Sequence, residues 1–145
     1  MDFAASIATA SPDDARIPVP TADLLIQHHK TRAARVSVGV PTGGHMLHLA
    51  VATCLFNDLH TAAARAGLSL GPVAVRAAGG FDETLTSSTG IVLEVEVTGD
   101  ADPEELRTLV LETFEVSTVA SILRESTSVE ITHITARTTT ASGSP

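Results

Sequence analysis

The chain has 145 residues, of which 43% are hydrophobic and 18% are charged. This composition supports one domain with a hydrophobic core and argues against disorder. Seventeen acidic and nine basic residues give a net charge of −8, which disfavours nucleic acid as a partner. The apolar runs are far shorter than the roughly 20 residues that cross a bilayer, so we expect no membrane association.

Cysteine and lysine usage indicate the compartment and the kind of genome. Cys54 is the single cysteine, so the chain cannot form an internal disulfide, which fits a reducing cytoplasm. The first ten residues lack the basic start of a secretory signal, and we therefore expect a cytoplasmic protein. Lys30 stands against eight arginines in a chain rich in Ala, Val, Thr and Gly, a composition that indicates a GC-rich bacterial genome.

The two ends of the chain carry signals that oppose regular structure. Prolines at 12, 18 and 20 predict a loose segment over residues 1–20. The small polar residues of 138–145 predict a disordered tail. Residues 21–137 then form a single domain, whose first element we expect to be a short helix over 21–28.

The centre of the chain carries the strongest secondary-structure signal. Residues 35–40 alternate with period two and predict a strand, which Pro41 and the following glycines end. Residues 45–66 hold neither Gly nor Pro and predict a long helix that Gly67 stops. Because this helix is apolar almost all round for its first fifteen residues, we expect it to be buried.

The second half of the chain predicts two strands, two helices and a last strand. The strands cover 72–78 and 91–97, and the last one covers 128–136. Asp102-Pro103-Glu104-Glu105 begins a helix with a capping carboxylate, a proline in the first turn and two favourable charges, and a short helix covers 118–123. The predicted fold class is α+β, with a small antiparallel sheet on the long helix. Four short strands cover only one side of that helix, so we expect a homodimer in which the long helices pack together.

Five segments together resemble the OsmC/Ohr family of osmotically inducible and organic-hydroperoxide-resistance proteins. The likeness runs from about Val36 to Ile134 and depends on the order and spacing of the five. They are Gly43-Gly44, Leu49–Cys54, Ala64–Leu68 with Val73–Val75, Val97–Asp102, and Val116–Val119.

The resemblance implies an intertwined homodimer with active sites at the subunit interface. It also implies reduction of organic hydroperoxides by two cysteines, assisted by an arginine and a glutamate. Cys54 matches the first, peroxide-attacking cysteine, whereas Phe114-Glu115 stand where the second is expected. The glutamate of the family falls at about Gly44, and the arginine has only the candidates Arg16, Arg32 and Arg35. The ordinary two-cysteine mechanism is therefore excluded.

Cys54 is nevertheless a candidate catalytic residue. A peroxide-reducing cysteine must form a thiolate and then a sulfenic acid that another thiol resolves, here an external one. Against this, Asp58 lies one turn further along the helix, where a carboxylate disfavours a thiolate. The alternative is a small buried hydrophobic residue, which is the usual role of a free cysteine.

His45 and His48 are also candidate catalytic residues, because their spacing places both on one helix face near its start. The positive end of the helix dipole there favours a neutral imidazole that can act as a base. The alternative is that they cap the helix or face a partner chain. We expect no metal, because His60 and Cys54 point elsewhere on the helix, and no cofactor.

The predicted substrate-binding residues surround these candidates: Gly43, Gly44, Asn57, Asp58 and Phe114. For Asp58 the alternative is an ion pair with Arg65 or an N-terminal arginine. Three functions remain open at this point. They are a divergent enzyme acting on a small organic molecule in an interface pocket, a stress-response hydroperoxide reductase that uses Cys54 alone, and a non-catalytic dimer that binds a small molecule.

Overall fold

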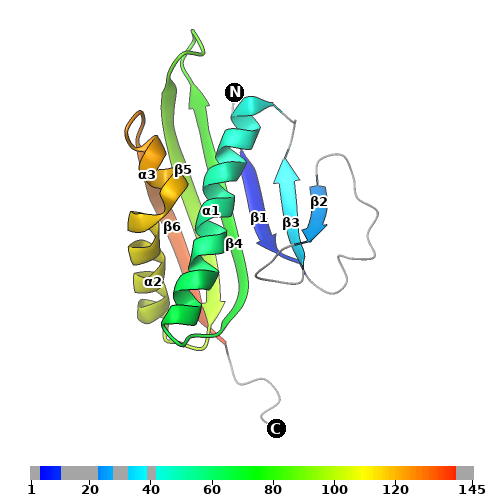
Figure 1. The fold of residues 1–145 in the computed structure, drawn as a ribbon, viewed down its shortest axis with the longest axis vertical. Coiled ribbons are helices and arrows are strands. Elements are labelled where there is room, and N and C mark those ends of the chain that lie inside the picture. Colours follow the sequence, from blue (N-terminus) through cyan, green and yellow to red (C-terminus); the bar gives the residue numbers. More distant parts are fainter. Residues whose placement is uncertain (1–3, 11–22, 28–32, 39–41, 140–145) are drawn as a thin grey trace.

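A computed structural model describes residues 4–10, 23–27, 33–38 and 42–139. In the described parts, one six-stranded sheet carries three helices on one of its faces (Figure 1). The strand order across the sheet is β2-β3-β1-β4-β5-β6. In chain order the elements are β1 (Ala5–Thr9), β2 (Asp23–Gln27), β3 (Ala33–Val38), α1 (Gly43–Arg65), β4 (Leu70–Phe81), β5 (Ser88–Gly99), α2 (Pro103–Val116), α3 (Thr118–Leu123) and β6 (Val129–Thr138).

The first half of the fold contains two corrections to the predicted elements. The segment 1–20 is not loose throughout, because residues 5–9 form β1 between β3 and β4, with Ile7 fully buried. The helix expected over 21–28 is wrong, since 23–27 form β2, which pairs with β3. A five-residue segment has too weak a local preference to decide between the two, and pairing in the sheet decides it. Residues 11–22 lie outside the described part.

The sheet differs from the predicted small antiparallel one in size and in direction. It has six strands instead of four, and β6 pairs with β5 in the parallel direction. The two helices α2 and α3 form the crossover that a parallel pair requires. The predicted tail is also wrong at its start, because Thr138 ends β6 and the Thr139 amide donates to the Gly99 carbonyl. Residues 140–145 lie outside the described part.

The helix α1 covers Gly43–Arg65, so it begins two residues before the predicted 45–66 and includes the glycines that were expected to break the chain. Thr42 caps it by accepting a hydrogen bond from the His45 amide, and Gly67 follows it with a φ of +73°, a conformation that favours glycine. The helix lies across β1 and β4 and buries one face, which includes Leu55, Phe56 and Leu59. Each of these side chains contributes about 1.5–3 kcal/mol through burial.

Part of the opposite face of α1 is exposed in the described structure. Met46, Ala50 and Ala64 are exposed there. The helix was expected to be covered on its remaining side by a second copy of the chain; within the described residues the sheet, α2 and α3 contact it. None of the helices in the described ranges is long and apolar enough to cross a membrane.

The helix α2 forms through the capping signals that its sequence carries. The Asp102 side chain accepts from the Glu105 amide, Pro103 stands in the first turn, and both glutamates lie there too. Its buried residues, which include Leu106 and Val110, face α1 and the β5–β6 side of the sheet. Its C-terminal half therefore lies alongside α1, and Ser117 joins it to α3.

Candidate functional site

Cys54 lies in a cluster of three polar side chains between α1 and the α2–α3 junction. Its thiol lies 3.6 Å from Oδ2 of Asp58, one helical turn further along. The Ser117 hydroxyl lies 3.0 Å from the same Oδ2 and 3.4 Å from the Cys54 sulfur. A hydroxyl has one proton, so the shorter contact to the carboxylate is its donor bond. Both donors thus converge on one oxygen of Asp58.

Ser117 is held by the change of direction between the two helices. It ends α2 and precedes α3 with φ −66° and ψ 124°, and its side chain makes no capping bond to α3. Only 1% of its surface is exposed. The side chain is therefore fully committed to the cluster with Asp58 and Cys54.

The sequence analysis missed Ser117 as a site residue. Its segment Val116–Val119 was used for the resemblance, but no role was assigned to the serine. Its position could have indicated a role, because Ser117 is a polar residue between two predicted helices and follows the place of the expected second cysteine. Among the described residues the hydrogen-bond partners of Asp58 are Cys54 and Ser117, and the N-terminal candidates Arg16 and Arg32 for an ion pair lie outside the described part.

The geometry determines which form of Cys54 this cluster accommodates. The thiol donates to the carboxylate, so the contact requires the protonated sulfur. A thiolate at that distance would face a second negative charge. The structure brings no arginine of the described segments to the sulfur, whereas peroxide-reducing cysteines need a nearby positive charge.

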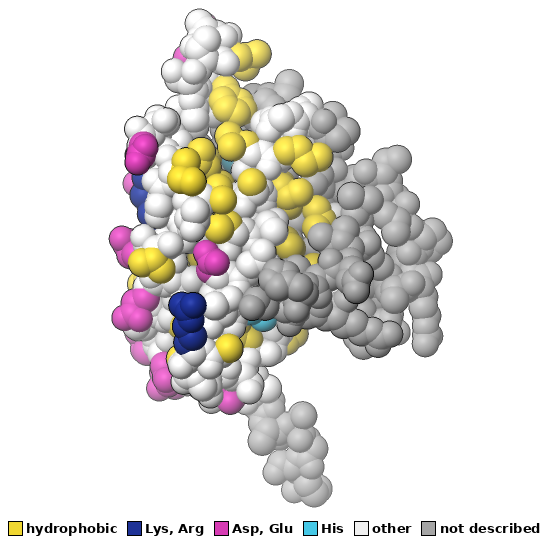
Figure 2. Space-filling view, viewed as in Figure 1, with side chains coloured by type: hydrophobic (Ala, Val, Ile, Leu, Met, Phe, Trp, Pro, Cys, Tyr) yellow, Lys and Arg dark blue, Asp and Glu magenta, His cyan; other side chains and the backbone are white. Residues whose placement is uncertain are grey.

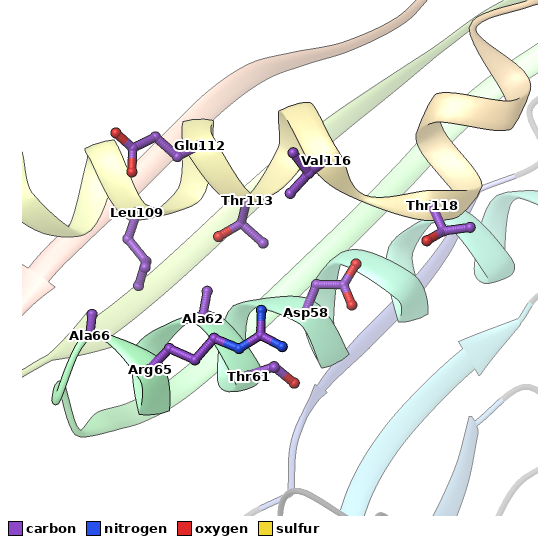
Figure 3. Close-up of a pocket in the computed structure, with 10 residues that line it drawn as sticks. All are labelled: Asp58, Thr61, Ala62, Arg65, Ala66, Leu109, Glu112, Thr113, Val116 and Thr118. Carbon is purple, nitrogen blue, oxygen red and sulfur yellow. The ribbon is translucent and has the colours of Figure 1, made fainter.

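A groove of about 570 Å³ opens beside the cluster, between α1 and α2, and its volume is in the usual range for small-molecule sites. It is open on one side toward solvent, and Figure 3 shows the side chains that line it. They are Asp58, Thr61, Ala62, Arg65, Ala66, Leu109, Glu112, Thr113, Val116 and Thr118. Asp58 is the residue that belongs to both the groove and the cluster. Its second oxygen, Oδ1, accepts no hydrogen bond from the described residues.

The two histidines lie near the start of α1, at the other end from the groove, and His48 packs against β4. His48 is fully buried, its Nδ1 lies 2.6 Å from the Gly44 carbonyl, and its ring meets Phe81 edge-on. A carbonyl only accepts, so Nδ1 of His48 carries the proton. His45 is buried too, with its Nδ1 2.6 Å from the Thr42 hydroxyl. His45 thus contacts the capping residue of α1, and His48 is packed in the interior, a placement that the sequence analysis did not predict.

The remaining predicted site residues do not gather with Asp58. Phe114 is buried beneath the Arg124 guanidinium, which lies 4.2 Å from its ring centre. Gly43 is exposed at the start of α1, far along the helix from Asp58. The backbone carbonyl of Asn57 accepts a hydrogen bond from the Thr61 hydroxyl, and Asn57 does not line the groove. Of the predicted residues, the structure joins Cys54 and Asp58.

No metal centre is formed by the described residues, because no three His, Cys, Asp or Glu side chains gather among them in a way that holds an ion.

Known proteins were compared with the chain by sequence and by structure. A model of the family described as OsmC-like protein matches residues 38–132. No curated protein sequence matches the chain.

Solved structures share the fold at low sequence identity. A hypothetical protein from Aquifex aeolicus superposes with a TM-score of 0.61 at 12% identity, over 86% of this chain and 94% of its own. An OsmC-like protein from Mycoplasma pneumoniae gives 0.55 at 11% identity, over 81% and 99%. An organic hydroperoxide resistance protein from Legionella pneumophila, also titled a predicted redox protein, gives 0.51 at 12% identity, over 81% and 99%.

At these identities the superpositions establish the α+β fold, while the family match covers residues 38–132 and thus most of the chain. The region includes α1 with Cys54 and Asp58 as well as the α2–α3 junction with Ser117. The chain therefore belongs to the OsmC family.

Proposed function

We propose that the protein is a divergent enzyme of the OsmC family that acts on a small polar organic molecule in the groove between α1 and α2. Asp58 is its acid–base group. The observation that carries this proposal is the convergence of the Cys54 and Ser117 donors on Oδ2 of Asp58, beside a groove of about 570 Å³. Two bonds to one oxygen fix the carboxylate plane and leave Oδ1 available to a ligand.

The chemistry assigned to Asp58 is proton transfer. A substrate O–H or N–H that reaches Oδ1 donates a hydrogen bond to it, and Asp58 accepts that proton as the substrate reacts. Cys54 and Ser117 do not touch the groove themselves, so both are positioning residues in this proposal. A carboxylate held by two donors needs no rearrangement before it accepts a proton, which is the benefit of preorganisation.

A second function, hydroperoxide reduction by Cys54 alone, has one observation in its favour. The Ser117 oxygen lies 3.4 Å from the sulfur and can turn its proton toward it. The reaction would convert the thiol and ROOH to a sulfenic acid and ROH. Two external thiols would then reduce the sulfenic acid to the thiol and water while forming a disulfide between them. The Asp58 carboxylate beside the sulfur opposes the thiolate that starts this sequence.

Hydroperoxide consumption separates the two functions. Cumene hydroperoxide with excess dithiothreitol is given to wild type, Cys54→Ser and Asp58→Asn. We expect wild type to consume no more peroxide than Cys54→Ser. Turnover by wild type that disappears in Cys54→Ser overturns the assignment of Asp58 and establishes the one-cysteine peroxidase.

Ligand binding tests the groove directly. Small hydroxylated and aminated molecules, charged and neutral, are added to isotope-labelled protein, and amide shifts are followed by NMR. We expect ligands to shift residues of α1 and α2 around the groove, and Asp58→Asn to weaken that binding. Glu115→Gln removes one carboxylate from an exposed position of α2 outside the groove and serves as the matched control.

We further propose that the functional form is a homodimer. Figure 2 shows hydrophobic side chains spread over the helical side of the molecule. Val116 and Ile122, on α2 and α3, are 77% and 61% exposed in one chain. Burying these exposed hydrophobic side chains in an interface with a second copy of the chain favours association. Light scattering coupled to size exclusion tests this, and a mass of one chain at micromolar concentration would contradict it.

A further inference from the structure

We infer that the groove binds an aliphatic carboxylic acid that carries a hydroxyl or ammonium group at its far end, with Arg65 as the carboxylate-binding residue. This inference rests on the proposed function, because it places the donor group of the same ligand at Asp58. It goes beyond it by naming the ligand class and a second binding residue in the groove.

The first support is the arrangement of charge along α1. Asp58 and Arg65 both line the groove, two helical turns apart, so their Cα atoms lie about 10 Å apart along the helix. Figure 3 shows the Arg65 side chain extending along α1 in the direction of Asp58. One groove thus holds an acceptor for a donor group and a cation whose side chain is directed toward it.

The second support is that no hydrogen bond or ion pair engages the Arg65 guanidinium within the described part of the chain. No carboxylate of the described residues pairs with it, and its side chain is exposed. The Glu112 carboxylate also lines the groove, but Figure 3 shows it directed away from α1. A planar guanidinium with donors available in a fork is suited to a carboxylate, which it binds through two parallel hydrogen bonds.

The third support is the apolar part of the groove lining. Ala62, Ala66, Leu109 and Val116 give the groove an apolar wall. Such a wall packs against methylene groups and offers them no hydrogen bond. The ligand that satisfies all three regions has a short aliphatic chain between a carboxylate and a hydrogen-bond donor.

The net charge of the chain makes the contact with Arg65 specific. At a net charge of −8, the protein as a whole repels an anion, so an acid that binds is held by local contacts. Arg65 also has a purely structural reading. It lies in the last turn of α1, where its positive charge stabilises the helix by complementing the negative end of the dipole. That reading predicts an effect of Arg65 on stability and none on ligand choice.

The test compares acids with their neutral amides on purified full-length protein. Lactate, 4-hydroxybutyrate, 6-hydroxyhexanoate and 4-aminobutyrate are each paired with the corresponding primary amide, and dissociation constants are measured by NMR titration. We expect at least one acid to bind wild type about tenfold more tightly than its amide, as a charge-assisted bidentate contact implies. Arg65→Gln removes this difference, Arg65→Lys restores part of it, and Arg137→Gln, which removes an exposed charge from β6, leaves it unchanged.

Each result separates this inference from the proposed function. Equal binding of acids and amides that still depends on Asp58 overturns the role of Arg65 and leaves the proposed function standing. Acid binding that depends on Arg65 and not on Asp58 keeps the carboxylate site and removes the acid–base assignment. If neither acids nor amides bind, both fail. Unfolding curves of Arg65→Gln show whether the variant is folded, and a stability effect without any change in ligand preference overturns the inference in favour of the structural reading.

Discussion

Ser117→Ala tests whether the three-residue cluster between α1 and the α2–α3 junction is an interacting unit. The change removes a hydroxyl that is 1% exposed and lies 3.0 Å from Oδ2 of Asp58. Hydrogen bonds to charged groups contribute about 1.5–3 kcal/mol. Since Asp58 is only half-buried and water can replace part of the lost bond, we expect a loss of about 1.5–2 kcal/mol in the free energy of unfolding, in the lower part of that range.

The backbone at Ser117 does not complicate this substitution. Its φ and ψ are those of extended backbone, which alanine adopts, and its side chain makes no capping bond. The loss is therefore attributable to the contacts with Asp58 and Cys54. Ser126→Ala, at an exposed position after α3, is the matched control and changes stability by less than about 0.5 kcal/mol.

The assay is urea unfolding at one fixed protein concentration, because association adds a concentration-dependent contribution to stability. The single variants Ser117→Ala and Asp58→Asn and their double variant form a thermodynamic cycle. We expect a coupling energy of at least about 0.5 kcal/mol, as is usual for residues in contact. Additive effects, or a loss in Ser117→Ala no larger than in Ser126→Ala, would refute the cluster.

Three further predictions concern the sheet, the start of α1 and the hairpin between β4 and β5. In Gly79→Ala the new Cβ would lie 2.3 Å from a carbonyl oxygen of β5, so we expect the free energy of unfolding to fall by about 2 kcal/mol or more. In Gly43→Ala the new Cβ meets nothing within 4 Å, so we expect the free energy of unfolding to rise by up to about 1 kcal/mol. Urea unfolding measures both changes. The Thr86 amide chiefly lowers the pKa of Asp82, so this carboxylate stabilises the hairpin above its ordinary pKa and stops doing so as the pH falls through the lowered one. An NMR titration should give a midpoint below that of a free aspartate, and the advantage of wild type over Asp82→Asn should vanish at acidic pH; a midpoint at or above the free value contradicts this. Leu85 has a φ of +59°, so Leu85→Asn should raise stability by about 0.5 kcal/mol, and a lower stability would be inconsistent with strain there.

The elements that local signals specify were predicted correctly. The helix α2 has its capping aspartate, its proline and its first-turn glutamates in sequence, and it begins at Pro103 as expected. The helix α1 is long, contains no helix breaker beyond Gly44 and is followed by Gly67. In both cases the residues that start and stop the helix are neighbours in the chain, so tertiary contacts were not needed to find them.

The elements that depend on distant pairing were not predicted. Residues 5–9 and 23–27 are short and carry no alternation strong enough to outweigh nearby prolines and a capping pattern, yet both pair with β3. The parallel direction of β6 follows from the α2–α3 crossover, which no local pattern of the last strand reveals. Strand identity here is decided by the partner strand.

The candidate site divides in the same way. The sequence by itself determined that Cys54 is the single cysteine, that no two-cysteine reaction is available, and that Asp58 stands one turn beyond it on a helix. That Ser117, 59 residues from Asp58, donates to the same carboxylate, and that His48 packs against β4, follow from the tertiary structure alone. Spacing along one helix is a property of local geometry, whereas a contact between α1 and the α2–α3 junction depends on how the helices pack on the sheet.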